Sequence, residues 1–204
     1  MKQKAAILAS GRGSNARKIL EIKDSLVNID ISLLISNRQA AACLNLEKEY
    51  DIQTLLISSK NLSQQEHERL LIKKLREHNI SWIFLAGYMK ILSSHFLSNF
   101  YDKTWKQNKV INIHPSLLPK FKGLNAYQQA FASNDDHSGI TIHFVDSDVD
   151  SGQIITQKKF EKDKKDSLDD FIQRGLKIEH KLYPQVLKKL DKALNSQRPE
   201  ELFK

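Results

Sequence analysis

Two side chains that can stabilise a developing negative charge stand close together in the middle of the chain. Asn112 and His114 belong to a short apolar segment that Pro115 and Pro119 follow. If the segment is a strand, residues two apart project to the same face of the sheet. The amide can then donate a hydrogen bond to an oxyanion, and a protonated imidazole adds positive charge. A single strand histidine is more often a packed or surface group, so this interpretation depends on the neighbouring features.

A loop rich in acids is the first of these features. Residues 146–152 read Asp-Ser-Asp-Val-Asp-Ser-Gly and follow an apolar run at 140–145. A carboxylate beside an imidazole raises the pKa of the imidazole. The alternatives are a solvated loop or an acidic stretch that resembles a calcium site, although the rest of an EF-hand is missing. The loop therefore predicts a carboxylate partner for His114.

A glycine turn follows the first apolar run of the chain. Gly11-Arg12-Gly13-Ser14-Asn15 permits positive φ and the close approach of an anion to backbone amides. A simple tight turn with Ser14 as the helix N-cap is an equal alternative. The spacing is not the full dinucleotide pattern, and Ile35-Ser36-Asn37 lacks the ribose-binding acid. A nicotinamide cofactor is therefore disfavoured.

The elements that must position these residues follow from the hydrophobic pattern. Apolar runs predict strands and helical spacing predicts helices, in alternation. The strands are expected at 5–9, 29–35, 52–57, 81–86 and 109–113, and the helices at 14–26, 40–50 and 63–78. Later strands at 140–145 and 153–160 are expected to be antiparallel, and a helix at 168–194 closes the chain, with Pro184 as a kink or boundary.

Continuous apolar strands that alternate with helices are typical of a parallel sheet covered on both faces. The predicted fold class is therefore α/β: a Rossmann-like doubly wound, mostly parallel sheet with helices on both faces and an antiparallel C-terminal addition. A chain of 204 residues fits a single domain, 1–204. His143 is expected to support the structure, and His67, His78 and His95 to lie on helix or loop surfaces.

Composition excludes several classes. The apolar stretches are far shorter than the ~20 residues of a membrane helix, so no membrane association is expected. Cys43 is the only cysteine, which rules out an internal disulfide and fits a reducing cytoplasm. No cysteine cluster or histidine pair has metal-site spacing, so no metal is predicted. Cys43 is expected to pack.

The net charge of +8 could favour binding of nucleic acid, of an acidic membrane surface or of small anionic substrates. The lysines between residues 158 and 165 alternate with acids, and no aromatic ladder accompanies them as a strand-stacking surface requires. This pattern indicates a solvated loop. We therefore expect small-molecule substrates and no nucleic acid.

With these residues in view, the chain resembles the folate-dependent formyltransferases over most of its length. The segment Asn-Ile-His-Pro-Ser-Leu-Leu-Pro, residues 112–119, is a strong motif of that fold. The glycine turn at 11–15, the segment at 85–92 and His143-Phe144-Val145 with Asp150 are similar to the glycinamide ribonucleotide formyltransferases. This resemblance implies transfer of the formyl group of 10-formyltetrahydrofolate to the amine of 5'-phosphoribosylglycinamide in purine biosynthesis.

The resemblance also implies roles for individual residues. Asn112 and His114 would stabilise the tetrahedral oxyanion, and Asp150 would hold His114 protonated. The phosphate and ribose of the ribonucleotide would contact Gly13, Ser14, Asn15 and Glu179. The folate pocket would be formed by Met89, Lys90, Ile91, Leu92, Asn112, Asp146, Ser147, Asp148, Val149 and Asp150. Residues 1–100 would then be the phosphate-binding half and 101–204 the catalytic and folate-binding half of a monomer or weak homodimer.

Three departures from the family pattern stand out. Gln64 occupies a position where an arginine that contacts the folate is frequent, residues 103–108 resemble a small insertion, and His137 and Ser138 differ from the usual pattern before Gly139. None of them removes a residue of the expected catalytic set.

Two other functions remain open on the sequence. One is a related enzyme. A methionyl-tRNA formyltransferase would need a further C-terminal domain, whereas this sequence ends at Lys204. A formyl-folate hydrolase would have a different motif around the histidine and an N-terminal regulatory domain. The other is a non-catalytic nucleotide or nucleic-acid binding module, which would bind polynucleotide in a salt-dependent way and would not need Asn112, His114 and Asp150 together.

Overall fold

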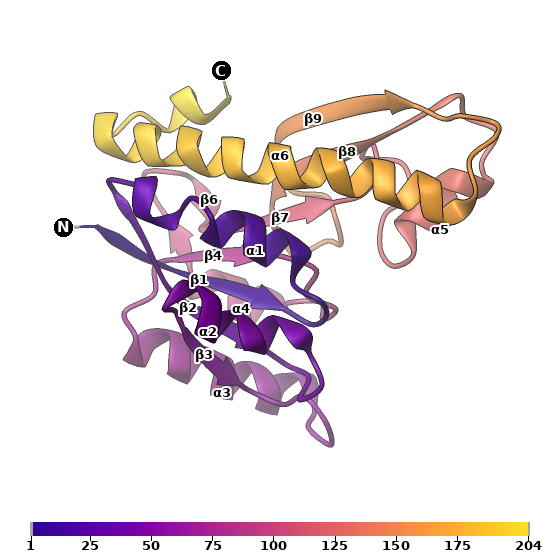
Figure 1. Cartoon of the computed structure of the whole chain (residues 1–204). Coiled ribbons are helices and arrows are strands. Elements are labelled where there is room, and N and C mark those ends of the chain that lie inside the picture. Colours follow the sequence, from indigo (N-terminus) through magenta and orange to yellow (C-terminus); the bar gives the residue numbers. More distant parts are fainter. Residues whose placement is uncertain (1, 204) are drawn as a thin grey trace.

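A seven-stranded sheet forms the centre of the computed structural model, which describes residues 2–203 (Figure 1). The spatial order of the strands is β3-β2-β1-β4-β7-β8-β9. Their bounds are β1 Gln3–Ala9, β2 Ile29–Ser36, β3 Gln53–Leu56, β4 Trp82–Leu85, β7 Val110–His114, β8 His137–Phe144 and β9 Ile154–Glu161. The pairs from β3 to β7 are parallel, and β8 and β9 are antiparallel additions. The predicted fold class is confirmed.

Helices cover both faces because the strands are apolar on both sides. Ala5, Ile7 and Ala9 of β1 belong to one buried cluster, and the alternating Ala6 and Leu8 belong to the other. The first cluster includes residues of α1 (Ser14–Leu20), η2 (Ala42–Leu46) and α6 (Leu168–Ser196), and the second includes residues of α3 (Gln64–Glu77) and α4 (Ser94–Ser98). The remaining helical segments are η1 Lys23–Ser25, α2 Glu47–Tyr50, α5 Ala126–Ala132 and η3 Pro199–Phe203.

Several predicted boundaries differ from those in the structure. The helix expected at 14–26 ends at Leu20 and is followed by η1, and the one expected at 40–50 is the 3-10 segment η2 with the short α2. The N-cap of α1 is Gly13, which has left-handed φ, rather than Ser14. Cys43 is buried in η2, as expected for a packing residue.

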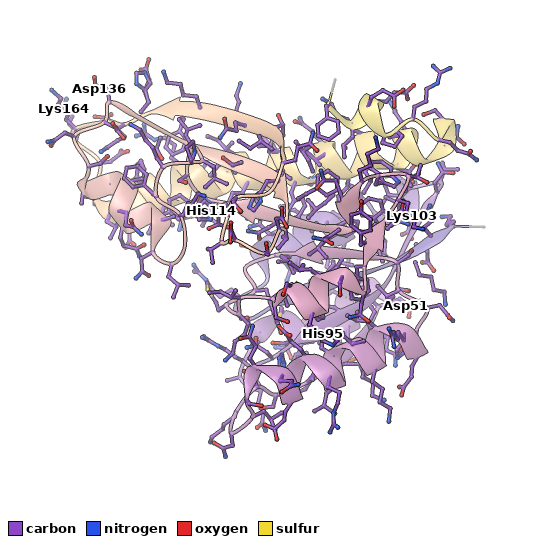
Figure 2. The ribbon with its side chains drawn as sticks, turned by 180° about the vertical axis from the view of Figure 1, so that it is seen from behind. Asp51, His95, Lys103, His114, Asp136 and Lys164 are labelled. Carbon is purple, nitrogen blue, oxygen red and sulfur yellow. The ribbon has the colours of Figure 1, made fainter. Side chains whose placement is uncertain are left out.

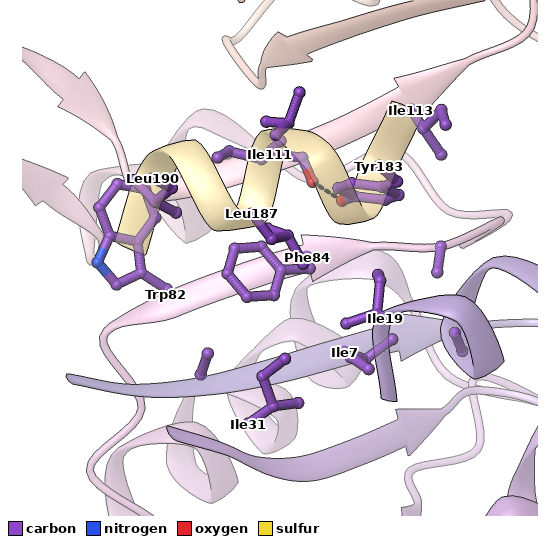
Figure 3. Packing of buried hydrophobic residues seen from close by; sticks show 14 of the residues in the cluster. Ile7, Ile19, Ile31, Trp82, Phe84, Ile111, Ile113, Tyr183, Leu187 and Leu190 are labelled. Carbon is purple, nitrogen blue, oxygen red and sulfur yellow. Dashed lines mark hydrogen bonds between the residues drawn. The ribbon is translucent and has the colours of Figure 1, made fainter. Parts of the chain in front are cut away.

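The long helix α6 runs through Pro184 without ending there. Its buried face holds it in place: Tyr183, Leu187 and Leu190 pack over β4 and β7 (Figure 3). Oη of Tyr183 lies 2.9 Å from the carbonyl oxygen of Ile111 and 3.1 Å from that of Leu85. This hydrogen bonding ties α6 to two central strands, so Pro184 marks neither a helix boundary nor a break in packing.

The expected insertion at 103–108 belongs to a small hairpin of β5 (Tyr101–Asp102) and β6 (Gln107–Asn108). The ring of Trp105 meets Trp82 edge-on with centroids 5.1 Å apart, and Lys109 pairs with Asp102 at 2.7 Å. Trp82 is the first residue of β4, so its contact with Trp105 places the hairpin at the amino ends of the central strands. Lys103 and His114 accordingly lie well apart in Figure 2.

Candidate active site

The carboxyl ends of the central strands border a cavity of about 820 Å³. Its walls come from the glycine turn after β1, the segment after β4, the end of β7, the loop after β8 and the start of α5. Parallel strands of an open sheet present their carboxyl ends at one edge, where ligands of such folds bind. Nearly all the predicted site residues meet in this cavity.

Asn112, His114, Asp150 and His143 form one connected polar cluster. Oδ2 of Asp150 lies 3.3 Å from Nδ1 of His114, and Oδ1 lies 3.5 Å from Nε2 of His143. Nδ2 of Asn112 lies 3.3 Å from Nε2 of His143. All four residues line the cavity. The predicted amide, imidazole and carboxylate are therefore brought together, although Asp150 is far from the other two in the sequence.

His143 orients the amide of Asn112. Its Nδ1 lies 2.7 Å from the carbonyl oxygen of Phe144 and so carries the proton, which leaves Nε2 as an acceptor. One hydrogen of the Asn112 amide is then held by His143, while the other can face a ligand in the cavity. The expectation that His143 supports the structure agrees with its burial, and the contacts with Asn112 and Asp150 place that support inside the site.

The charge of His114 reflects two opposed effects. Burial lowers the pKa of His114 below its ordinary value, and the Asp150 carboxylate and the Phe121 carbonyl only partly oppose this. Nε2 of His114 lies 2.8 Å from the Phe121 oxygen, to which it donates. Burial thus favours the neutral imidazole, whereas the acceptors that face both ring nitrogens favour the protonated form.

Asp150 is held as a carboxylate. Burial alone would raise the pKa of Asp150, but the contact with the His143 ring, the hydrogen bond from the backbone N–H of Gly123 and the neighbouring His114 lower it overall. The Gly123 N–H donates to Oδ2 at 2.8 Å. Asp150 has a positive φ of 49°, and a Cβ on Gly152 would lie 1.9 Å from the Phe144 oxygen. The loop can therefore fold back over β8 only with glycine at 152.

The glycine turn packs closely against η2. Gly13 has a φ of 79°, and a Cβ there would lie 2.6 Å from Cβ of Cys43. Gly11, by contrast, has open space around it. The turn therefore requires glycine at 13, and Gly13, Ser14 and Asn15 all border the cavity.

A second polar cluster lies beside this turn. Nδ2 of Asn15 and Oη of Tyr127 both donate hydrogen bonds to the carboxylate of Glu179 on α6. Burial raises the pKa of Glu179, and the two donors oppose that rise. Tyr127 was not among the residues predicted from the sequence, since its local pattern does not distinguish it from a packing aromatic.

The predicted folate wall is only partly assembled. Met89, Lys90, Ile91, Leu92, Asp146, Ser147 and Val149 line the cavity, whereas Asp148 does not. Met89 and Ile91 are 53% and 64% exposed, so they form an apolar rim rather than core packing. Gln64 also lines the cavity, and its Nε2 donates to the Ile91 oxygen at 3.0 Å.

The prediction that His67 lies on a helix surface is wrong. His67 is only 4% exposed, lines the cavity and lies with Nε2 3.0 Å from the Ile57 oxygen. Burial lowers the pKa of His67, so the ring is neutral. The buried face of α3 includes this position because Leu71 follows it by one helical turn.

Among residues 2–203, no group of three His, Cys, Asp or Glu side chains is arranged to hold a metal ion. None of the helices described there is long and apolar enough to cross a membrane.

A doubly wound sheet that presents an amide, an imidazole and a carboxylate at its carboxyl edge is the arrangement of an enzyme that stabilises an oxyanion. The formyl transferase family model matches residues 3–187. The phosphoribosylglycinamide formyltransferase of Bacillus subtilis is 37% identical over 92% of this chain and 94% of its own, and that of Haemophilus influenzae is 37% identical over 91% and 86%. The crystal structure of phosphoribosylglycinamide formyltransferase from Bacillus halodurans superposes with a TM-score of 0.84 at 34% identity, over 92% of this chain and 95% of that one. The chain belongs to the formyl transferase family and, within it, to the phosphoribosylglycinamide formyltransferases.

Proposed function

We propose that this enzyme transfers the formyl group of 10-formyltetrahydrofolate to the amine of 5'-phosphoribosylglycinamide, a step of purine biosynthesis. The observation that carries the proposal is the convergence of Asn112, His114 and Asp150 in the cavity that also contains the glycine turn. Transfer between two small molecules requires both to lie in one cavity, with the oxyanion-stabilising groups between them.

Asn112 and His114 stabilise the intermediate in this proposal. When the amine attacks the formyl carbon, the carbonyl oxygen becomes an oxyanion, and the free hydrogen of the Asn112 amide donates to it. His114 exchanges its hydrogen bond to Phe121 for one to the oxyanion, and the developing negative charge raises the pKa of the imidazole. The imidazole takes up a proton from solvent, and the nearby Asp150 carboxylate stabilises the imidazolium. Asp150 also accepts the amine proton, directly or through water, and passes it to the folate nitrogen that carried the formyl group. Tetrahydrofolate then leaves as a neutral amine when the oxyanion collapses and the C–N bond breaks.

The ribonucleotide occupies the end of the cavity near the glycine turn. Backbone amides of Gly13, Ser14 and Asn15 bind its phosphate, and Glu179 accepts hydrogen bonds from its ribose hydroxyls. The folate occupies the other end, against Met89, Lys90, Ile91, Leu92 and the loop of Asp146, Ser147, Val149 and Asp150. Asp148 does not line the cavity. Residues 1–100 thus supply the phosphate-binding half, and 101–204 most of the catalytic and folate-binding half, of a single domain.

The proposal also covers the location of the enzyme in the cell and its partners. A single buried cysteine suits a reducing cytoplasm, and we propose that location. We propose a monomer or weak homodimer, which needs no metal and binds no nucleic acid.

Absorbance of the folate during incubation tests the proposal. Deformylation of 10-formyltetrahydrofolate is followed with and without the ribonucleotide, in the wild type and in Asn112→Ala. Turnover that requires the ribonucleotide and collapses in the variant supports the function and the site. Folate loss without the ribonucleotide indicates a hydrolase, and no loss at all, with tight polynucleotide binding, indicates the binding module.

A further inference from the structure

The cluster around Glu179 holds more hydrogen-bonding capacity than its protein partners use. Glu179 is 4% exposed and Asn15 is 8% exposed. The Asn15 amide donates to Glu179, while its own Oδ1 is buried and has no hydrogen-bond partner among residues 2–203. A buried acceptor without a partner is costly. Asn15, Tyr127 and Glu179 all line the cavity, and each Glu179 oxygen accepts only one hydrogen bond from the protein. The remaining lone pairs of the carboxylate suit a ligand that brings hydroxyl donors.

Tyr127 contacts the other oxygen of the Glu179 carboxylate. Its Oη donates to Oε1 of Glu179 at 2.5 Å, whereas Asn15 takes Oε2. The ring packs edge-on against Phe171 with centroids 6.0 Å apart. Because each carboxylate oxygen has one donor and the tyrosine ring is itself fixed, the plane of the Glu179 carboxylate has one defined orientation.

Gly175 provides the space for this arrangement. It lies one helical turn before Glu179 in the interior of α6, where glycine is the least favourable residue apart from proline. A Cβ at 175 would lie 2.4 Å from both Cε1 and Oη of Tyr127. The glycine therefore lets the phenol cross the helix surface and reach the carboxylate.

The geometry points to Tyr127 as a positioning residue that, with the space left by Gly175, orients the Glu179 carboxylate for the ribose hydroxyls of the ribonucleotide substrate. This inference rests on the proposed function, since it concerns the ribonucleotide end of the same cavity. Tyr127 acts through Glu179 and does not take part in the chemistry of formyl transfer. Its loss should therefore weaken ribonucleotide binding and leave the chemical step largely intact.

Steady-state transfer in Tyr127→Phe provides the first test. The KM for the ribonucleotide is expected to rise about tenfold, as for the loss of one charge-assisted hydrogen bond, while kcat and the KM for the folate change less than about twofold. The control is Tyr101→Phe, an exposed tyrosine on β5 far from the cavity, which should leave all three constants unchanged. An unchanged ribonucleotide KM in Tyr127→Phe would overturn the inference.

Two further measurements distinguish positioning from general packing. Gly175→Ala introduces a better helix former, yet it should displace Tyr127 and raise the same KM; the double variant with Tyr127→Phe should be no worse than either single variant. Lys177→Ala, an exposed change on the same turn of α6, is the matched control. A normal KM in Gly175→Ala, or full additivity in the double variant, would contradict the inference.

Analogues of the ribonucleotide that lack a ribose hydroxyl provide a third test. The 2'-deoxyribose and 3'-deoxyribose analogues of the ribonucleotide should bind less tightly to the wild type, and this discrimination should shrink in Tyr127→Phe, as measured by calorimetry. Equal discrimination in both proteins would exclude a link between Tyr127 and the ribose hydroxyls. If the wild type binds the ribonucleotide but transfers no formyl group, the proposed function fails while the binding data still decide this inference; if it does not bind the ribonucleotide, both fail.

Discussion

Oδ2 of Asp150 lies 3.3 Å from Nδ1 of His114 and also accepts the backbone N–H of Gly123 at 2.8 Å. One carboxylate oxygen thereby joins the end of β7, the loop after β8 and the loop before α5. The loop after β8 is exposed from Asp146 to Val149, but Asp150 is mostly buried. The electrostatic partner of the imidazole is thus a defined part of the site rather than a mobile surface acid.

Removal of this carboxylate should change the titration of His114. In Asp150→Asn the burial that lowers the pKa of His114 remains, while the charge that opposes it is lost, so the pKa should fall further below its ordinary value. Asparagine tolerates the positive φ at this position, so the loop should keep its path. Titration of the histidine rings by NMR measures the shift, with the exposed Asp24→Asn as control. An unchanged or higher pKa in Asp150→Asn would contradict the pairing.

Loss of the oxyanion donors should reduce the rate and leave the fold intact. Asn112→Ala and His114→Ala are each expected to lower kcat by ~10²–10³. His95→Ala, an exposed histidine on α4, is the control. Single-turnover transfer gives the rates, and circular dichroism with thermal unfolding checks the fold. Full activity in either site variant would refute its assigned role.

The glycine turn should tolerate a methyl group at one glycine and not at the other. Gly13→Ala must strain a φ of 79° and displace Cys43, so it should lower the free energy of unfolding by more than ~1 kcal/mol. It should also weaken ribonucleotide binding, because the turn moves. Gly11→Ala meets nothing within 4 Å and should unfold at the wild-type urea concentration. Similar unfolding midpoints for the two variants would show that the turn is not packed as described.

The buried His67 should make stability depend on pH. Burial lowers the pKa of His67 in the folded state, so the unfolded chain binds more protons near its ordinary pKa. The stability that neutral His67 contributes is thus present above about pH 6.5 and is lost as the pH falls.

His67→Gln isolates this contribution, because glutamine can still donate to the Ile57 carbonyl and does not titrate. The free energy of unfolding of the wild type, relative to that of His67→Gln, should decrease between about pH 8 and about pH 5.5 in urea titrations. A constant difference, or one that grows on acidification, would show that the ring is protonated or exposed.

The sequence alone predicted the seven strands of the main sheet and the antiparallel direction of the last two, and it placed Asn112 and His114 on one face of a strand. The alternation of apolar runs and helical spacing follows from burial of the sheet on both faces, which is a local property of each segment. Asn112 and His114 were identified together because a strand places residues two apart on one face. The boundaries of the short helical segments were less predictable, since weak intrinsic preferences compete there with packing such as that of Cys43 against Gly13.

Contacts between distant segments decided the rest of the site. Only the folded chain shows that Asp148 does not line the cavity, that His67 is buried, and that His143 holds the Asn112 amide. The contact of Tyr127 with Glu179 depends on how α5 meets α6 and on the missing side chain at Gly175. Sequence periodicity indicates which face of an element is buried, but the pairing of polar groups depends on where other elements place their side chains, and that is fixed only by tertiary packing.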